Sequence, residues 1–264
     1  MLHFGMPTLI ETNSIDDCVT LANELGLKFI EINMNMPEYQ LDKIDIVHFK
    51  KLAEHNNIYF TIHLDENLNF CDFNPYVANA YLKTVTDTIS LAKQLCVPVL
   101  NMHLSDGVYF TLPDKRVFLF EQYIKRYLKV VKDFVAVCES EIGDSDIKIC
   151  IENSSGFRSF HKQALEIMLE SPVFALTYDV GHDHGLGGAD GEFIFKNIEK
   201  LRHIHLHDAV GKSHHLALGS GEININHYLN VANDNNCRVV IETKTIESLK
   251  QSVEWLNINN KIRT

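Results

Sequence analysis

Six apolar segments of this chain each carry a histidine or a carboxylate at or near their C-terminal end. The segments have the aliphatic and β-branched composition of buried strands. In a closed parallel barrel, the C-terminal ends of the strands meet at one mouth, where catalytic residues gather. The recurrence therefore predicts a barrel with imidazoles and carboxylates around its mouth. In TIHL, LNMHL, ICIEN, LTYDVGH, HIHLHD and VVIET, these residues are His63, His103, Glu152, Asp179, His205 and Glu242.

Strand-like and helix-like segments alternate along the whole chain. The predicted strands are Leu2–Gly5, Phe29–Met34, Tyr59–Leu64, Val97–Leu104, Ile147–Asn153, Phe174–Asp179, His203–His207 and Arg238–Thr243. Amphipathic helices are predicted near Ser14–Leu25, Asp42–His55, Pro75–Leu95, Asp114–Ser140, His161–Leu169, Gly191–Leu201, Ile225–Asn235 and Ile246–Leu256. Eight such pairs predict an α/β fold, a (β/α)8 TIM barrel. In the alternative, an open doubly wound sheet, six polar strand ends would lie too far apart to share one site.

The length of the chain fits a single barrel. It has 264 residues, 45% of them hydrophobic, which is enough to bury a substantial core. One (β/α)8 barrel typically needs about 250 residues. Two small domains are the alternative, but no Pro/Gly/Ser-rich linker, low-complexity tract or long charge block divides the sequence. We therefore predict one domain over residues 1–264.

The charge balance bears on the class of partner. The chain carries 24 Lys and Arg against 35 Asp and Glu, a net charge of −11. An acidic surface repels phosphate backbones, so composition disfavours nucleic acid and favours a small-molecule substrate. Oligomeric state is left open by the sequence.

Cysteine usage and the N-terminus bear on the compartment. The six cysteines are dispersed without a CxxC pair, and Cys96 and Cys150 lie in segments where buried thiols are expected. MLHFGMPTLIETN lacks the basic and long apolar parts of a signal peptide, and no apolar stretch is long enough for a membrane span. We expect a soluble cytoplasmic protein.

Four of the polar strand ends form the tightest candidate set. Glu152, Asp179, His205 and Glu242 end strands five to eight. A single strand-end carboxylate often caps the next helix or pairs with a lysine, but four at equivalent places favour a common role. Carboxylates together with imidazole suit a divalent metal, with Zn²⁺ or Mn²⁺ first and Co²⁺ or Mg²⁺ as alternatives.

Further histidines leave the ligand set open. Side chains alternate between the two faces of a strand, so His203, His205 and His207 lie on the same face. Their position in this alternation therefore does not show which of them is the metal ligand. His203 comes early in the strand and is expected deep in the barrel, which leaves His205 and His207. His63 and His103 are candidates for a second metal or for substrate binding. Two further candidates for this role, from the loops after Asp179 and before LALGSGEI, are His182 and His215.

Two cationic residues near the strand ends are candidates for substrate binding. Arg158 follows the small residues Ser154, Ser155 and Gly156, a loop that could seat a phosphate or sugar hydroxyls ahead of a helix. A plain turn is the alternative for this loop. Lys244 directly follows the last strand and could neutralise a phosphate or pair with a carboxylate.

These motifs together resemble the xylose isomerase-like TIM-barrel superfamily, which includes sugar phosphate isomerases and epimerases and endonuclease IV. IENSSG resembles the strand-five Glu motif, DVGH the D-x-x-H motif, and HLHDA the H-x-x-D motif. HLALGSGEI resembles the H-x-x-LGxG segment, and VVIET the last-strand Glu. The resemblance runs from about His3 to Trp255 and favours His205 over His207 as the ligand.

The isomerase and epimerase branch implies one metal on the four-residue set. In that branch Glu152, Asp179, His205 and Glu242 would hold the ion, and the two glutamates would also move protons. The metal would polarise a carbonyl and the adjacent hydroxyl, which makes the neighbouring C–H proton easier to remove.

The endonuclease IV branch implies three zinc ions on nine residues. Eight of the nine have counterparts here, and the resemblance implies that the third ion would rest on His182 and His215. The ninth, an aspartate two residues before the histidine of the LGxG segment, falls on Ser213, which is a poor zinc ligand. We therefore expect a metal-dependent sugar or sugar-phosphate isomerase/epimerase. An endonuclease IV-like zinc phosphodiesterase acting on abasic DNA or a smaller phosphoester is the second hypothesis. A catalytically inactive metal-binding barrel is the third.

Overall fold

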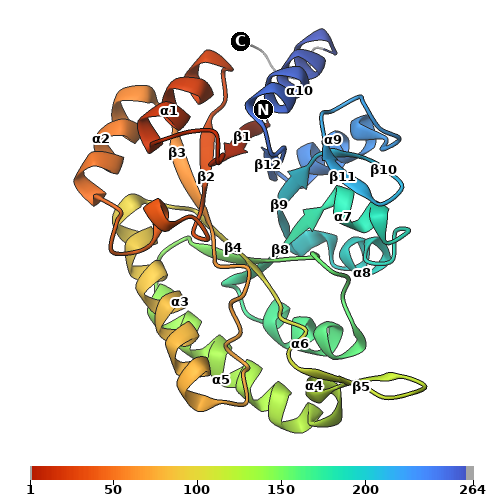
Figure 1. Ribbon diagram of the computed structural model, residues 1–264. Coiled ribbons are helices and arrows are strands. Elements are labelled where there is room, and N and C mark those ends of the chain that lie inside the picture. Colours follow the sequence, from red (N-terminus) through yellow and green to blue (C-terminus); the bar gives the residue numbers. More distant parts are fainter. Residues whose placement is uncertain (1, 260–264) are drawn as a thin grey trace.

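Eight parallel strands close into a barrel in the computed structural model, which describes residues 2–259 (Figure 1). Neighbouring strands follow one another around the barrel in chain order, and β1 pairs with both β2 and β12. The predicted TIM barrel is thereby confirmed. The strands are β1 (His3–Pro7), β2 (Phe29–Asn33), β3 (Tyr59–His63), β4 (Val99–His103), β7 (Lys148–Glu152), β8 (Phe174–Asp179), β9 (Leu201–Leu206) and β12 (Arg238–Ile241).

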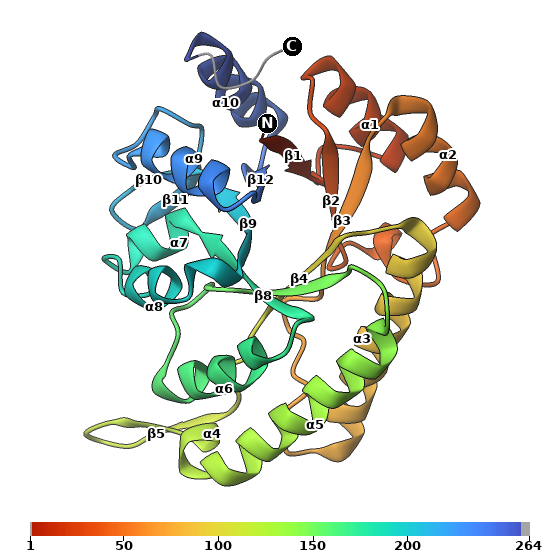
Figure 2. The same ribbon diagram turned by 180° about the vertical axis from the view of Figure 1, so that it is seen from behind.

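Helices surround the barrel on its outside, as both views show (Figures 1 and 2). Their apolar faces pack against the outward side chains of the strands and form the main core. The long helices are α1 (Ile15–Glu24), α2 (Ile46–Asn56), α3 (Pro75–Leu95), α5 (Ile124–Ile142), α6 (Ser159–Glu170), α9 (Ile225–Asp234) and α10 (Ile246–Ile258). Shorter turns are α4 (Leu119–Gln122), α7 (Val180–Gly185), α8 (Gly191–Lys196), η1 (Pro37–Tyr39) and η2 (Ile198–Lys200).

Local sequence signals start two of these helices. Ser14 accepts a hydrogen bond from the backbone N–H of Asp17 at 3.2 Å, which satisfies a free donor of the first turn of α1. Asn74 caps α3 in the same way, and Pro75 occupies the first helical position, where no N–H is needed.

The predicted helix Asp114–Ser140 is wrong at its beginning. Residues 109–118 instead form a hairpin of β5 (Tyr109–Thr111) and β6 (Arg116–Phe118), and α5 begins only at Ile124. Aromatic and β-branched residues on both arms favour strands, and Tyr109 lies opposite Phe118 in the register. The hairpin projects from the barrel beside α4 (Figure 1).

A layer of polar side chains lies inside the barrel beneath the mouth. Inward residues of the strands contribute Glu31, Thr61, Asn101 and Thr177, all buried. Thr61 Oγ1 donates to Glu31 Oε2 at 2.9 Å, and Thr177 Oγ1 donates to Asn101 Oδ1 at 2.5 Å. Because buried polar groups are stable only when they are hydrogen-bonded, this layer fixes the side chains on which the site rests.

Two properties of the chain bear on earlier expectations. Among the described residues, no helix is long and apolar enough to cross a membrane. The expectation of a buried thiol is correct for Cys150 but wrong for Cys96, which is exposed. Cys96 ends α3 in the left-handed conformation at φ 56°, and this turn leaves its side chain outside the core.

Candidate metal centre

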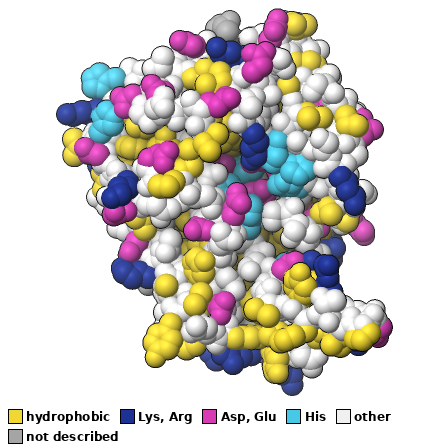
Figure 3. Space-filling model, in the orientation of Figure 1, with side chains coloured by type: hydrophobic (Ala, Val, Ile, Leu, Met, Phe, Trp, Pro, Cys, Tyr) yellow, Lys and Arg dark blue, Asp and Glu magenta, His cyan; other side chains and the backbone are white. Residues whose placement is uncertain are grey.

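A cavity of about 470 Å³ opens at the C-terminal ends of the barrel strands. Figure 3 shows histidine and acidic side chains gathered in a hollow on this face. The volume is in the range of small-molecule sites. Its lining residues are His63, Glu66, Asn67, His103, Glu152, Ser154, Ser155, His182, His215, Glu242 and Lys244.

The four predicted strand-end residues converge at the base of this cavity. Glu152, Asp179, His205 and Glu242 each offer an oxygen or nitrogen atom within 4.8 Å of the other three. His205 Nδ1 lies 3.3 Å from Glu152 Oε2 and 3.1 Å from Glu242 Oε2. The first two carboxylates and the imidazole are at most 2% exposed. The set is therefore closely spaced, almost dry and anionic.

Glu31 supports this set from below and was missed in the sequence. Its Oε1 lies 2.8 Å from His205 Nε2, and its Oε2 lies 2.8 Å from His203 Nε2. The contact to Nε2 leaves His205 Nδ1 facing the carboxylates. A carboxylate in the middle of the apolar strand FIEIN was the available signal, because such a charge must find a buried partner.

His207 also lies behind the set. Its Nδ1 accepts a hydrogen bond from the backbone N–H of His215 at 2.8 Å, so its proton is on Nε2. That Nε2 donates to Asp179 at 3.1 Å. Only His205 of the two candidates joins the four-residue group, while His207 holds the Asp179 carboxylate in place.

Gly181 leaves the space that His207 needs. A Cβ atom on Gly181 would lie 1.9 Å from the imidazole, so Gly181→Ala is expected to displace His207. We expect a loss of about 1–3 kcal/mol in the free energy of unfolding, measured by urea denaturation. Gly185→Ala in the same helix is the matched control, because its nearest atoms are 3.8 Å away. Equal stability of the two variants would contradict this account of His207.

His63 and His103 flank Glu152 on the side of β3 and β4. Their Nε2 atoms lie 3.4 and 3.2 Å from Glu152 Oε2. Asn101 donates a short hydrogen bond to the same oxygen. Glu152 Oε2 thus stands among several imidazoles and an amide, an environment that keeps the carboxylate ionised.

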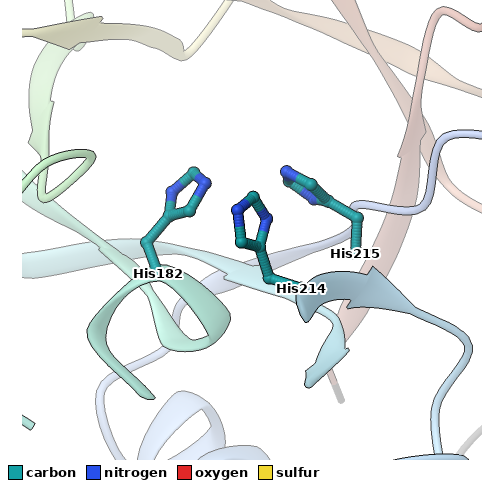
Figure 4. A group of neighbouring side chains, drawn as sticks. All are labelled: His182, His214 and His215. Atoms are coloured by element: carbon teal, nitrogen blue, oxygen red, sulfur yellow. The ribbon is translucent and has the colours of Figure 1, made fainter. Parts of the chain in front are cut away.

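His182 and His215 lie on the opposite side of the cavity, together with His214. His182 comes from α7, and the other two come from β11 (Ser213–Leu216), which pairs with β10 (Asp208–Val210). One ring nitrogen of each histidine lies within 4.8 Å of the other two (Figure 4). No metal role for His214 was predicted from the sequence.

The two predicted substrate-binding cations have different positions. Lys244 lines the cavity, and its Nζ lies 2.8 Å from Glu242 Oε1. Arg158 is absent from the residues that line the cavity. It forms a two-pronged ion pair with Asp106 at 2.6 and 2.7 Å, and its guanidinium lies 4.0 Å from the centre of the Phe118 ring. These contacts occupy the Arg158 side chain in joining α6 to the β5–β6 region.

The site's electrostatics follow from burial of opposite charges. Burial disfavours the ionised forms of Glu152 and Glu242, but His205 outweighs it and holds the pKa of both carboxyls well below the usual range. Burial also disfavours the ionised form of Asp179, but His207 outweighs this effect and the pKa of Asp179 falls to about 2. Burial opposes charge on His63, but Glu152 raises its pKa to about 9.

The residues present fit a divalent cation. Buried atoms with no aligned hydrogen-bond partner include His205 Nδ1 and Glu242 Oε2, which lie 3.1 Å apart within the set. Three carboxylates and one imidazole are hard-to-borderline ligands, which suit Mn²⁺, Zn²⁺, Co²⁺ or Mg²⁺. A bound cation would satisfy the unpartnered atoms and neutralise the clustered negative charge.

Comparison with known proteins identifies the family. The family model described as xylose isomerase-like TIM barrel matches residues 19–258. This chain belongs to that family. This xylose isomerase-like barrel is similar to the uncharacterized protein MJ1188 of Methanocaldococcus jannaschii, with 23% identity over 239 residues. That match covers 87% of this chain and 83% of the relative.

Solved structures share the fold along almost the whole chain. A D-tagatose 3-epimerase-like protein is 24% identical with a TM-score of 0.78, covering 99% of this chain and 100% of the other. D-psicose 3-epimerase from Clostridium cellulolyticum H10, solved with D-tagatose, is 15% identical at 0.73 and covers 98% of both chains. The IOLI protein, solved with a zinc atom, is 14% identical at 0.74 and covers 100% of both. At these identities the likeness shows the fold alone.

Proposed function

We propose that this barrel is a divalent-metal-dependent sugar or sugar-phosphate isomerase or epimerase. The observation that carries the proposal is the convergence of Glu152, Asp179, His205 and Glu242 within 4.8 Å at the base of an open cavity. Two of these residues are carboxylates that line the cavity and can exchange a proton with a bound molecule. Structural neighbours that carry epimerase names support this reaction class.

The proposed chemistry is proton transfer next to a carbonyl. A bound divalent ion would polarise the substrate carbonyl and the adjacent hydroxyl, which acidifies the C–H between them. Glu152 and Glu242 are ionised, so one can accept the carbon-bound proton. The other, after taking up a proton from water, can then give that proton to the planar carbon. Return of the proton to the other face of the same carbon inverts that centre. Return to the former carbonyl carbon, with transfer of the neighbouring hydroxyl proton to the former carbonyl oxygen, isomerises the sugar.

The remaining residues would hold the substrate and the two glutamates. Asn101 and His103 hold Glu152, and Lys244 holds Glu242 at 2.8 Å. The polar cavity wall, with Asn67, Ser154 and Ser155, offers hydrogen-bonding groups suited to sugar hydroxyls. In a sugar phosphate, the phosphate group would pair with the ammonium group of Lys244, which lines the cavity.

Exchange of a carbon-bound proton tests the proposal. The protein loaded with Mn²⁺ is incubated in D₂O with D-tagatose, D-allulose and their phosphates, and deuterium incorporation is followed by NMR. We expect incorporation next to the carbonyl for at least one of these ketoses. Absence of exchange with all of them, with metal bound, would count against proton transfer on ketohexoses.

A phosphodiesterase similar to endonuclease IV is the second candidate. A single metal held by the four-residue set would not need the imidazoles of His63 and His103, which lie beside Glu152. Their presence favours a hydrolase that uses more than one metal ion. This function predicts cleavage of DNA with an abasic site at low salt with Zn²⁺, weakening as salt rises. Intact DNA under these conditions would remove the candidate.

A further inference from the structure

A second cavity opens at the opposite end of the barrel, where the strands begin. Its volume is about 170 Å³, and its lining residues are Leu2, His3, Asn233, Asn236, Cys237 and Arg238. His3 begins β1 and Arg238 begins β12, and the two are register partners on these neighbouring strands (Figure 1). Pockets for drug-sized ligands measure about 300–1,000 Å³, so this cavity suits a small ion or a few water molecules.

Arg238 carries a charge that no carboxylate of the described residues neutralises. Its Nε is buried without a hydrogen-bond partner. Within residues 2–259, the lysines and arginines that form ion pairs are Lys43, Lys83, Lys129, Arg158 and Lys244. Arg238 is not among them, although the chain has 35 acidic residues against 24 Lys and Arg. A buried charge is costly unless it is paired, so an anion from solution would stabilise this side chain.

The groups next to Arg238 do not supply a negative charge. Its guanidinium lies 5.7 Å from the centre of the Tyr59 ring. Burial raises the pKa of the Tyr59 hydroxyl to about 12, although Arg238 opposes this effect, so the hydroxyl is uncharged at neutral pH. His203 is the register partner of Arg238 on β9, and its Nε2 donates to Glu31 at 2.8 Å. That carboxylate is already shared by His203 and His205.

The other polar groups of the cavity also suit an anion. The Tyr59 hydroxyl lies 3.1 Å from His3 Nδ1, which leaves Nε2 of this exposed imidazole for a further partner. Burial lowers the pKa of His3, and the charge of Arg238 adds to this effect, so the potential beside His3 is positive. Asn233 and Asn236 contribute side-chain amides, which can donate hydrogen bonds. The cavity thus combines a guanidinium, an imidazole and two amides.

We propose that this cavity binds a small oxyanion, with inorganic phosphate as the best match, at the N-terminal end of the barrel. The planar guanidinium of Arg238 offers parallel N–H groups that match two oxygens of a phosphate. His3 and the two asparagine amides would contact the remaining oxygens. The proposal goes beyond the proposed function, because the candidate metal centre lies at the other end of the strands.

NMR titration of the Mg²⁺-loaded protein with phosphate tests this site. The imidazole signal that is missing from His3→Gln identifies His3 in the wild type. With NaCl holding the ionic strength constant, we expect phosphate to shift this signal in a saturable way. We also expect the pKa of His3 to rise, because a nearby anion favours the protonated imidazole. A site of about millimolar affinity is nearly filled at about 20 mM phosphate.

Arg238→Gln is expected to weaken phosphate binding at least about tenfold, because it removes both the charge and the paired N–H donors. Arg202→Gln is the matched control. Arg202 lies on the neighbouring strand β9, where its Nη1 donates to the carbonyl of Leu201 at 2.6 Å, and it does not line the cavity. This variant loses the same charge at the same end of the barrel and should bind phosphate nearly like the wild type.

Asn236→Asp is a second variant that leaves the fold in place. Asn236 is exposed at φ 52°, a left-handed conformation that aspartate also tolerates. The new carboxylate beside the cavity should abolish phosphate binding. An unshifted His3 signal in the wild type at saturating phosphate would overturn the proposal, as would wild-type affinity in both Arg238→Gln and Asn236→Asp. Because the readout is at His3, its failure leaves the deuterium exchange of the proposed function unaffected.

Discussion

Glu152→Gln is expected to slow the exchange of the substrate's carbon-bound proton at least about hundredfold, because a positioned acid or base typically contributes that much or more. Glutamine keeps the size of the side chain and can still accept the hydrogen bond of Asn101. It cannot take a proton from carbon, and its amide is a weaker metal ligand. The measurement is deuterium incorporation from D₂O at saturating Mn²⁺. Because the metal site is then filled, a slower exchange reports loss of the base and not weaker metal binding.

Glu242→Gln should give a similar loss if the two carboxylates share the proton transfer. Glu66→Gln is the matched control, because Glu66 also lines the cavity but lies outside the four-residue set. It should exchange at nearly the wild-type rate. Retained exchange in both Glu152→Gln and Glu242→Gln would refute the proposed roles of these two glutamates.

Asp208→Ala is expected to cause the largest loss of stability, on the order of 4 kcal/mol in the free energy of unfolding. The carboxylate is buried and accepts four backbone N–H groups. Oδ1 accepts from Ala209 at 2.9 Å and Ile223 at 3.0 Å, and Oδ2 accepts from Gly219 and Gly221, both at 2.9 Å. Alanine leaves these donors without partners. Urea denaturation measures the loss.

Asp208→Asn provides the graded comparison. Asparagine keeps one acceptor oxygen for two N–H groups but turns an NH₂ group toward the other two, so its stability should fall between those of the wild type and Asp208→Ala. Wild-type stability in Asp208→Ala would show that water replaces the carboxylate, contrary to this account. The H-x-x-D motif thus combines His205 in the candidate centre with an aspartate that shapes the LGSG loop.

Much of the fold could be predicted from the sequence, because the barrel strands are local apolar segments. All eight predicted strands overlap the observed ones, and Pro75–Leu95 matches α3 at both ends. The hairpin of residues 109–118 was missed because its arms are only three residues long. The spacing of the apolar residues in this region also suits a helix. Short elements depend on tertiary contacts more than on periodicity.

The candidate site was less predictable where it depends on distant pairings. Strand-end position was enough to suggest Glu152, Asp179, His205 and Glu242, since parallel strands bring their ends together. Glu31 supports His205, 174 positions further along the chain, and only the closed barrel makes them neighbours. His214 joins its partners through the left-handed turn at His215, which the sequence does not reveal.

The central claim is that the four strand-end residues bind a divalent cation at the base of the barrel mouth. Anomalous X-ray diffraction from crystals soaked with Mn²⁺ tests it most directly. The account predicts a peak within coordination distance of Glu152, Asp179, His205 and Glu242, and loss of that peak in Glu152→Gln. A fully ordered mouth without a peak among these residues, at saturating Mn²⁺, would contradict it.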